Sequence, residues 1–361
     1  MTDLLFQEVL LPDGTKTLVD RPSFPFSPVR CPLRSPPREP ARDLAPSAPS
    51  RRWTVREFFE RHYLLEAESC KKPGTHKNHR QALDKLRVFC GGDPELDWVT
   101  RRRLKSFRRW LAKNCRAAST ANRHLRNILA VLREAVDENV CRPFGRKIRL
   151  LSEARKPARS WRMDELEKML ATVQDLAGQV GDVPASRWWR ALVLVLYDTG
   201  LRISATMALR WTDHKANADG IFFAVRGETQ KGGRSQRLGI SQQTAEALAA
   251  IAGDRELVFF WPWDPPDENG QRNWVTLRAR LRGDILGPAG VDAAGRQVLH
   301  AFRKTSGTQL KKAGGNATEQ LGHGSPAVTD RYIDPEELGA SRECDRLPRP
   351  GLPASRQRNL F

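Results

Sequence analysis

The sequence has no hydrophobic run long enough to cross a membrane. The longest run, residues 191–197, is far shorter than the roughly 18 residues that a spanning helix needs. The first ten residues, MTDLLFQEVL, hold no basic segment followed by an apolar stretch, so we expect no secretory signal. The six cysteines are scattered and form no Cys-x-x-Cys pair, which favours a reduced cytosolic compartment over a disulfide scaffold. Composition therefore excludes a membrane protein and a disulfide-rich secreted domain.

Acidic residues are scarce relative to basic ones. The 361 residues include 61 Lys and Arg against 42 Asp and Glu, a formal net charge of +19. The imbalance is local, because residues 51–160 hold 28 basic and 12 acidic residues. The surface of an ordinary soluble protein carries positive and negative side chains interspersed with one another. The charge therefore predicts a module that grips the phosphates of a nucleic acid, in a cytoplasmic, nucleoid-associated protein.

The chain divides by composition into five segments. Residues 1–52 are rich in proline and predict an arm or linker. Residues 53–142 predict a small helical domain with a basic surface, and residues 143–160 a basic linker broken by proline and glycine. Residues 161–335 predict a second domain, and residues 336–361 a tail. The predicted fold class is mainly α with a small β-sheet (α+β).

Within the first segment, the sequence Pro12-Asp13-Gly14 is typical of a turn. It leaves open both a short hairpin over residues 1–20 and disorder.

Hydrophobic periodicity predicts the elements of the two domains. The helical domain is expected to contain helices from residue 53, over 76–90, over 101–113, and from a cap at Ser119 or Thr120. In the second domain we expect helices over 163–177, 188–198, 241–252, 274–282, 301–313 and 326–333, and strands over 220–226, 234–240 and 258–260.

The candidate DNA-binding residues are basic and lie off the apolar stripes of the helices or in the linker. They are Arg101, Arg102, Arg103, Lys105, Arg108, Arg109, Arg123, Arg126, Arg146 and Lys147.

Six residues that can hold or attack a phosphate lie in short motifs of the second domain. They are Arg202 in TGLRIS, Lys231 in ETQKGGRSQ, His300 and Arg303 in HAFR, His323 in LGH, and Tyr332 in TDRYID. Each of these residues, found alone, more often has a structural role than a catalytic one. Their order and spacing together indicate a catalytic site.

This set resembles the tyrosine recombinase (phage integrase) family over roughly residues 53–340. The phrase ALRW at 208–211 adds to the likeness. The resemblance implies that residues 53–142 form a SAM-like core-binding DNA-binding domain and residues 161–335 the catalytic domain. It implies a site-specific recombinase that forms a 3′-phosphotyrosine intermediate, acts on double-stranded DNA as a homotetramer on paired sites, and needs no cofactor or metal.

The resemblance also assigns roles. Tyr332 is the implied nucleophile, and Lys231 the general acid that protonates the leaving oxygen. Arg202 and Arg303 are suited to hold the phosphate oxygens, because guanidinium stays protonated and binds oxygens in pairs. The two histidines of the set can donate to the same oxygens or carry a proton.

The sequence departs from the family pattern at three places. Ala205 stands where the family usually has an acidic residue, Lys304 where histidine is frequent, and residues 313–321 are shorter than the usual helix.

Three other readings remain open: a DNA-binding protein of the same fold without cleavage, a type IB topoisomerase-like enzyme, and a helix-turn-helix regulator. Ala205 is the only residue that favours the first of these. The sequence names no target site. It also does not decide whether accessory DNA-bending or directionality proteins take part.

Overall fold

The computed structural model describes residues 6–10, 16–20, 52–66, 73–145, 147–154, 157–267, 270 and 272–339. The chain forms two compact units, Met1–Arg52 and Trp53–Phe361. In the first unit, β1 (Phe6–Leu10) pairs antiparallel with β2 (Lys16–Asp20). Of the two possibilities for this segment, the structure therefore describes the hairpin.

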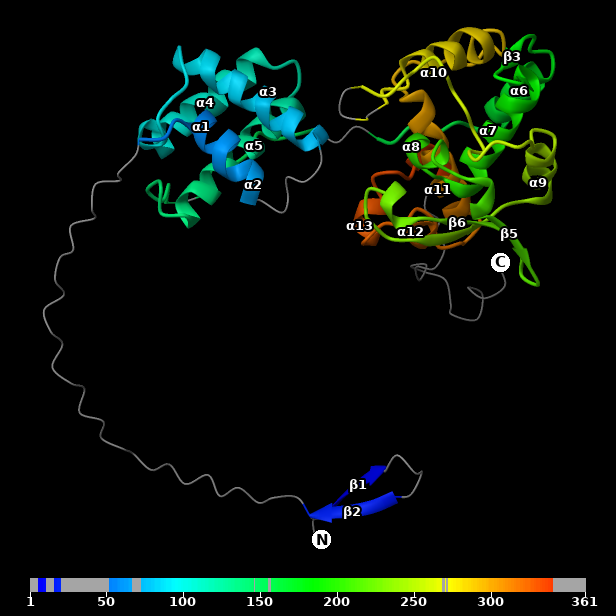
Figure 1. Ribbon diagram of the computed structural model, residues 1–361, viewed down its shortest axis with the longest axis horizontal. Helices are drawn as coiled ribbons and strands as arrows, with labels where there is room; N and C mark the ends of the chain where they lie inside the picture. The colour runs from blue at the N-terminus through cyan, green and yellow to red at the C-terminus, as the bar shows by residue number, and fades with distance from the viewer. Residues whose placement is uncertain are drawn as a thin grey trace, which may run out of the picture. The chain divides into compact units, whose positions relative to one another are not determined.

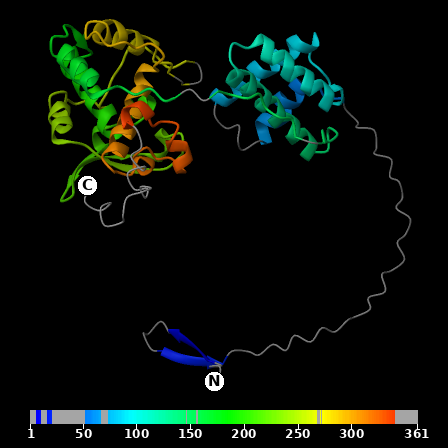
Figure 2. The same ribbon diagram turned by 180° about the vertical axis from the view of Figure 1, so that it is seen from behind.

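The N-terminal part of the second unit, here called the helical region, is built from helices (Figures 1 and 2). Its elements are α1 (Val55–Phe58), the π-helix Phe59–Tyr63, α2 (Leu64–Glu66), α3 (Pro73–Cys90), the 3₁₀ turn Leu96–Trp98, α4 (Arg101–Asn114) and α5 (Ala118–Asp137). Their apolar faces meet in one core that includes Phe58, Phe107 and Leu125. The described residues of this region form no strand beyond an isolated bridge between Thr54 and Glu95.

The caps of these helices differ from one another. Thr54 forms a capping box with Glu57 at the start of α1. The expected cap of α5 at Ser119 or Thr120 is wrong, because the helix already begins at Ala118 and its N-cap, Ala117, has no side-chain cap. Alanine has the highest helix propensity, so the helix extends past the hydroxyl residues to include Ala118.

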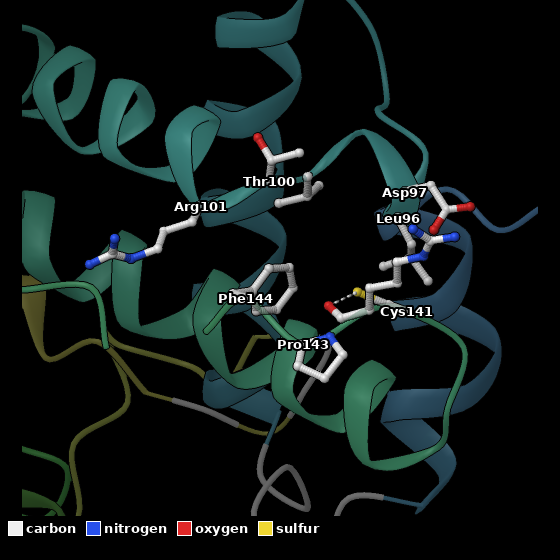
Figure 3. Close-up of a pocket in the computed structure, with 9 residues that line it drawn as sticks. Leu96, Asp97, Thr100, Arg101, Cys141, Pro143 and Phe144 are labelled. Atoms are coloured by element: carbon white, nitrogen blue, oxygen red, sulfur yellow. Dashed lines mark hydrogen bonds between the residues drawn. The ribbon is translucent and has the colours of Figure 1, made fainter. Parts of the chain in front are cut away.

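The segment that follows α5 folds back on the helical region (Figure 3). Cys141, Pro143 and Phe144 face the start of α4 across a pocket of about 460 Å³. Further on, Ile148 is buried in the helical core. The amide side chain of Asn122 on α5 donates to the Leu151 carbonyl and accepts from the Leu151 N–H. Much of the predicted linker thus packs on the helical region.

The C-terminal part of the second unit, here called the C-terminal region, mixes helices with short strands. Its helices are α6 (Met163–Gln174), α7 (Ala185–Thr199), α8 (Ile203–Thr206), α9 (Gln242–Ala249), α10 (Val275–Arg280) with the π-helix Leu281–Leu286, α11 (Val298–Lys312), α12 (Ala317–Gln320), α13 (Pro326–Thr329) and α14 (Pro335–Leu338). The strands are β3 (Gln179–Val180) paired with β4 (Val183–Pro184), and an antiparallel sheet in the order β5 (His214–Asn217), β6 (Gly220–Val225), β7 (Gln236–Gly239). Short 3₁₀ turns lie at Trp211–Asp213 and Gly227–Thr229.

Helix α7 is the centre of this region. It is apolar on nearly all sides, with residues such as Trp188, Leu192 and Leu196 buried. It packs on α6, α9 and α11 (Figure 1). The mainly helical class with a small sheet is confirmed.

Two expected elements are wrong in detail. Residues 258–260 form no strand, because this segment makes only an isolated bridge between Arg210 and Leu257. The last predicted helix ends at Thr329, and the chain then turns so that the Tyr332 N–H donates to the Thr329 carbonyl. Strand β5 was not expected, since only one of its residues, Ala216, is apolar.

Candidate active site

Arg303 is the most buried charged side chain of the site, with 1% of its surface exposed. It projects from α11. Its Nη1 donates to the Gly200 carbonyl at 2.6 Å, and its Nη2 donates to the Leu321 carbonyl and to Nε2 of His323 at 2.9 Å. Its buried Nε–H has no partner among the described residues. A buried donor without a partner costs free energy, so this N–H is suited to a ligand oxygen.

The contacts of His323 fix its tautomer. Nε2 accepts from Arg303, so the proton of the neutral ring sits on Nδ1. Nδ1–H then donates to Oγ1 of Thr329 at 3.0 Å, and that hydroxyl donates to Oγ1 of Thr318 at 3.0 Å. A chain of hydrogen bonds therefore runs from Arg303 through His323 to α13 and α12.

Tyr332 meets three of the predicted site residues. Its ring centre lies 4.5 Å from that of His323 and 5.2 Å from that of His300. Cζ of Arg303 lies 5.4 Å from the same ring. The Tyr332 side chain is half-buried, whereas the next residue, Ile333, is buried. The fold thus brings the two HAFR residues, the LGH histidine and the tyrosine together.

The pKa shifts at the site have burial as their first cause and the positive charge of the arginines as their second. Burial, followed by the charge of Arg303, lowers the pKa of both His300 and His323 to about 4. Burial, followed by the charge of Arg202, lowers the pKa of Arg303, and the Tyr332 hydroxyl opposes that shift. Arg202 also contributes to both histidine shifts. The charge of Arg202 therefore acts on the cluster formed by His300, Arg303, His323 and Tyr332. Such a cluster is suited to bind an anion.

Lys231 is the predicted catalytic residue that the structure leaves apart. It is exposed in the connection between β6 and β7. No contact joins it to the tyrosine or to the histidines among the described residues. The base of the connection does dock near the site, because Nε2 of Gln236 donates to the Glu319 carbonyl on α12 at 2.8 Å.

Several predicted DNA-binding residues have partners within the chain. Arg103 stacks on Trp98 at 4.1 Å, Arg108 donates to the Arg149 carbonyl at 2.9 Å, Arg109 donates to the Ser106 hydroxyl at 3.3 Å, and Arg126 lies 3.5 Å from Glu153. Arg102, Arg103, Lys105, Arg109, Arg123, Arg126 and Lys147 are exposed, and Arg101 and Arg108 are half-buried. Arg146 lies outside the described residues.

The departures from the family pattern have structural roles. Ala205 is buried, with 3% exposed, and belongs to the hydrophobic core around α7. Lys304 is half-buried beside the site. Burial lowers its pKa, and the charges of Asp334 and Tyr332 oppose that shift.

The sequence motifs missed residues that orient the site. Thr329 holds His323, and the Gly200 carbonyl holds Arg303. Asp334 caps α14 by accepting from the Glu336 N–H. The sequence Asp-Pro-Glu-Glu from residue 334 is a helix-start signal that would have found the last of these.

Two family models match the chain. The phage integrase family matches residues 159–338, and the phage integrase SAM-like domain matches residues 54–145. A curated relative, the tyrosine recombinase XerC of Rhodospirillum centenum, is 26% identical over 299 residues, which cover 75% of this chain and 80% of the relative.

Solved structures of integrases share the fold. The Tn1549 transposon integrase in complex with circular intermediate DNA superposes with a TM-score of 0.59 at 17% identity, covering 81% of this chain and 98% of that one. A lambda integrase tetramer bound to a Holliday junction gives a TM-score of 0.56 at 17% identity, covering 81% and 80%.

The fold is one shared with solved integrases, and the site gathers a tyrosine with cationic and imidazole side chains. This chain belongs to the tyrosine recombinase, or phage integrase, family. Among the described residues, no helix is both long and apolar enough to cross a bilayer.

Proposed function

We propose that this protein is a site-specific recombinase that cuts and rejoins double-stranded DNA through a 3′-phosphotyrosine intermediate. The observation that carries the proposal is the contact of the Tyr332 ring with His300, His323 and Arg303 in one positively charged cluster. Membership in the family supports the same reaction class.

The reaction divides the work among these side chains. The phenolic oxygen of Tyr332 attacks the phosphorus and loses its proton, and the bond between phosphorus and the 5′ oxygen breaks. Arg303 and Arg202 stabilise the negative charge that collects on the non-bridging oxygens, and removal of one such donor typically costs about a hundredfold in rate or more. The free Nε–H of Arg303 is the donor available for this purpose.

Proton transfer falls to the remaining groups. Both histidines are neutral at pH 7 because their pKa values are about 4. His300 is therefore able to accept the phenolic proton. Lys231 protonates the leaving 5′ oxygen once its exposed connection closes on the bound DNA. The total number of phosphoester bonds is conserved, so the reaction consumes no ATP.

The helical region supplies the electrostatic grip on DNA. Its candidate contacts are the exposed side chains of Arg102, Lys105, Arg109, Arg123 and Lys147, with Arg101, Arg103, Arg108, Arg126 and Arg146 as further members of the proposed set. A homotetramer on paired sites is the proposed active assembly, in line with the lambda integrase tetramer to which the fold is similar.

A covalent-adduct assay tests the proposal. The full chain is incubated with nicked suicide substrates that carry candidate recombination sites, and the products are separated on a denaturing gel. We expect a protein–DNA adduct with the wild type and none with Tyr332→Phe. Tyr197→Phe is the matched control, because Tyr197 lies on α7 away from the cluster, with its hydroxyl 3.7 Å from Sδ of Met163.

Other results would favour the alternatives. Tight DNA binding without any adduct would indicate a DNA-binding protein of this fold that does not cleave. Relaxation of supercoiled plasmid without a preferred site would indicate a type IB topoisomerase-like activity. Sequence-specific binding that drives gene regulation and survives Tyr332→Phe unchanged would indicate a regulator.

A further inference from the structure

The carboxylate of Asp334 binds a residue 174 positions earlier in the chain. Its Oδ2 accepts from the backbone N–H of Ser160 at 2.6 Å and from the Ser160 hydroxyl at 3.0 Å. Both residues are buried, with 5% and 1% of their surface exposed. Ser160 is the last residue of the predicted linker, and Asp334 lies two residues after Tyr332.

Both segments are also anchored on the same helix, α11. The Trp161 N–H donates to Oγ1 of Thr305 at 2.7 Å, and the Asp334 N–H donates to Oγ1 of Thr308 at 2.9 Å. The two threonines are fully buried. They are three residues apart and so lie on one face of the helix. The end of the linker and the tyrosine segment are thus held side by side.

The other carboxylate oxygen of Asp334 fixes the chain beyond the tyrosine. Oδ1 accepts from the Glu336 N–H at 3.1 Å and caps α14. Two residues of chain span at most about 7 Å between Cα atoms. A fixed Asp334 therefore restricts the backbone position of Tyr332 to a small volume.

We propose that Asp334 is a positioning residue that ties Tyr332 to the end of the linker, so that the placement of the nucleophile depends on the contact between Ser160 and Asp334. The expected effect of this contact on the reaction rate rests on the proposed function. Its expected effect on the position of Tyr332 is independent of that function.

The first measurement follows Tyr332 without any reaction. The chain has only three tyrosines, so incorporation of 3-fluorotyrosine into the full-length protein yields three fluorine resonances. Tyr332→Phe identifies the resonance of residue 332. We expect Ser160→Ala and Asp334→Asn to shift or broaden this resonance and to leave that of Tyr63 unchanged.

The second measurement is the rate of adduct formation on a suicide substrate, together with the Kd for the same DNA. Loss of a hydrogen bond to a charged group predicts a rate about tenfold lower in Asp334→Asn. Ser160→Ala retains the backbone N–H and is expected to lose less. Kd is expected to stay within about twofold, and the two substitutions are expected to be non-additive in the rate because they act on one contact.

Matched controls are Ser152→Ala, an exposed serine of the same linker, and Asp254→Asn, an exposed aspartate of the C-terminal region. Neither is expected to change the resonance of Tyr332 or the rate. If Asp334→Asn unfolds the C-terminal region, which the resonance of Tyr197 on α7 would report, Ser160→Ala still tests the contact because it removes only a hydroxyl.

The outcomes separate the two proposals. An unchanged Tyr332 resonance and an unchanged adduct rate in folded Ser160→Ala and Asp334→Asn would overturn the positioning role. A changed resonance in a protein whose wild type forms no adduct would support the link and overturn the recombinase reaction instead.

Discussion

The guanidinium of Arg303 owes its position to three acceptors from two separate segments. The carbonyls of Gly200 and Leu321 and the ring of His323 satisfy its two Nη groups, and Nε–H remains available. Arginine is suited to this place because its charge persists even when burial lowers its pKa. Lysine offers a point charge and could not reproduce the arrangement.

Thr329 provides a prediction about the tautomer of His323. Thr329→Val keeps the shape of the side chain but removes the acceptor for Nδ1–H. The neutral ring then loses its preference for an unprotonated Nε2, and the contact with Arg303 weakens. We expect adduct formation to slow by about tenfold, the equivalent of one lost hydrogen bond. Thr329→Ser retains the hydroxyl and is expected to keep most of the activity, and equal losses in both variants would contradict this role.

The two histidines of the site predict an effect of pH on stability. His300 and His323 have pKa values of about 4 in the folded protein, against an ordinary value of 6.5. As pH falls below 6.5 the unfolded chain takes up protons that the native rings do not, so stability decreases until about pH 4. Each ring is expected to cost roughly 1–2 kcal/mol by pH 5. Urea unfolding at pH 7 and pH 5 measures this loss. His300→Gln should reduce it, and an unchanged loss in that variant would contradict the shift.

At the level of elements, the turn between α7 and α8 sets the geometry of the site. Helix α7 is capped by Gly200, whose φ of 59° is left-handed, and Arg202 is the N-cap of α8. A Cβ at position 200 would lie 2.7 Å from Cδ2 of Leu321 and 2.9 Å from Oγ of Ser306. Only glycine allows the carbonyl to reach Arg303 in this backbone conformation.

Gly200→Ala is therefore expected to disturb both stability and activity. The left-handed backbone costs about 1 kcal/mol, and the clash with Leu321 adds roughly 1–3 kcal/mol. Gly290→Ala is the matched control, because its φ is 64° and nothing lies within 4 Å of the added Cβ. Urea unfolding and adduct assays are carried out on both variants. Gly290→Ala measures the cost of backbone strain alone, and Gly200→Ala measures strain together with the steric clash. Equal losses in the two variants would contradict the close packing around Gly200.

At the scale of the whole molecule, the positive charge is concentrated in one part of the chain, whereas hydrophobic cores occur in both described regions of the second unit. The described residues form two hydrophobic clusters, one in the helical region and one around α7. The excess of positive charge falls on residues 51–160. The proposed division of roles, with the helical region holding DNA and the C-terminal region carrying the reacting groups, agrees with this distribution.

This distribution predicts a steep effect of salt on DNA binding. Each neutralised phosphate contributes about −0.9 to the slope of log K against log salt concentration. Arg102→Gln removes an exposed cation of α4 and is expected to make the slope shallower by about one such unit. Lys168→Gln is the control, since Lys168 lies on α6 and pairs with Asp164 at 3.4 Å. A slope near zero for the wild type would contradict the electrostatic grip.

The amino-acid sequence alone determined the fold class and the family, and it proposed the reacting groups. Helical periodicity and local motifs are short-range properties, so HAFR, LGH and the tyrosine nine residues later could be found without coordinates. The sequence also favoured Tyr332 over Tyr197 as the candidate nucleophile, because Tyr197 lies inside an apolar helix. The borders of the predicted segments and the role of each site residue remain predictions.

Only the tertiary structure decided which groups hold the reacting ones in place. The contacts of Arg303 with Gly200, of His323 with Thr329 and of Asp334 with Ser160 include partners up to 174 positions apart. A hydrogen bond depends on distance and angle in space, and no pattern of nearby residues encodes a partner so remote. The catalytic role of Lys231 stays a prediction, because the residue is exposed in the connection between β6 and β7 and no contact of its side chain shows the role.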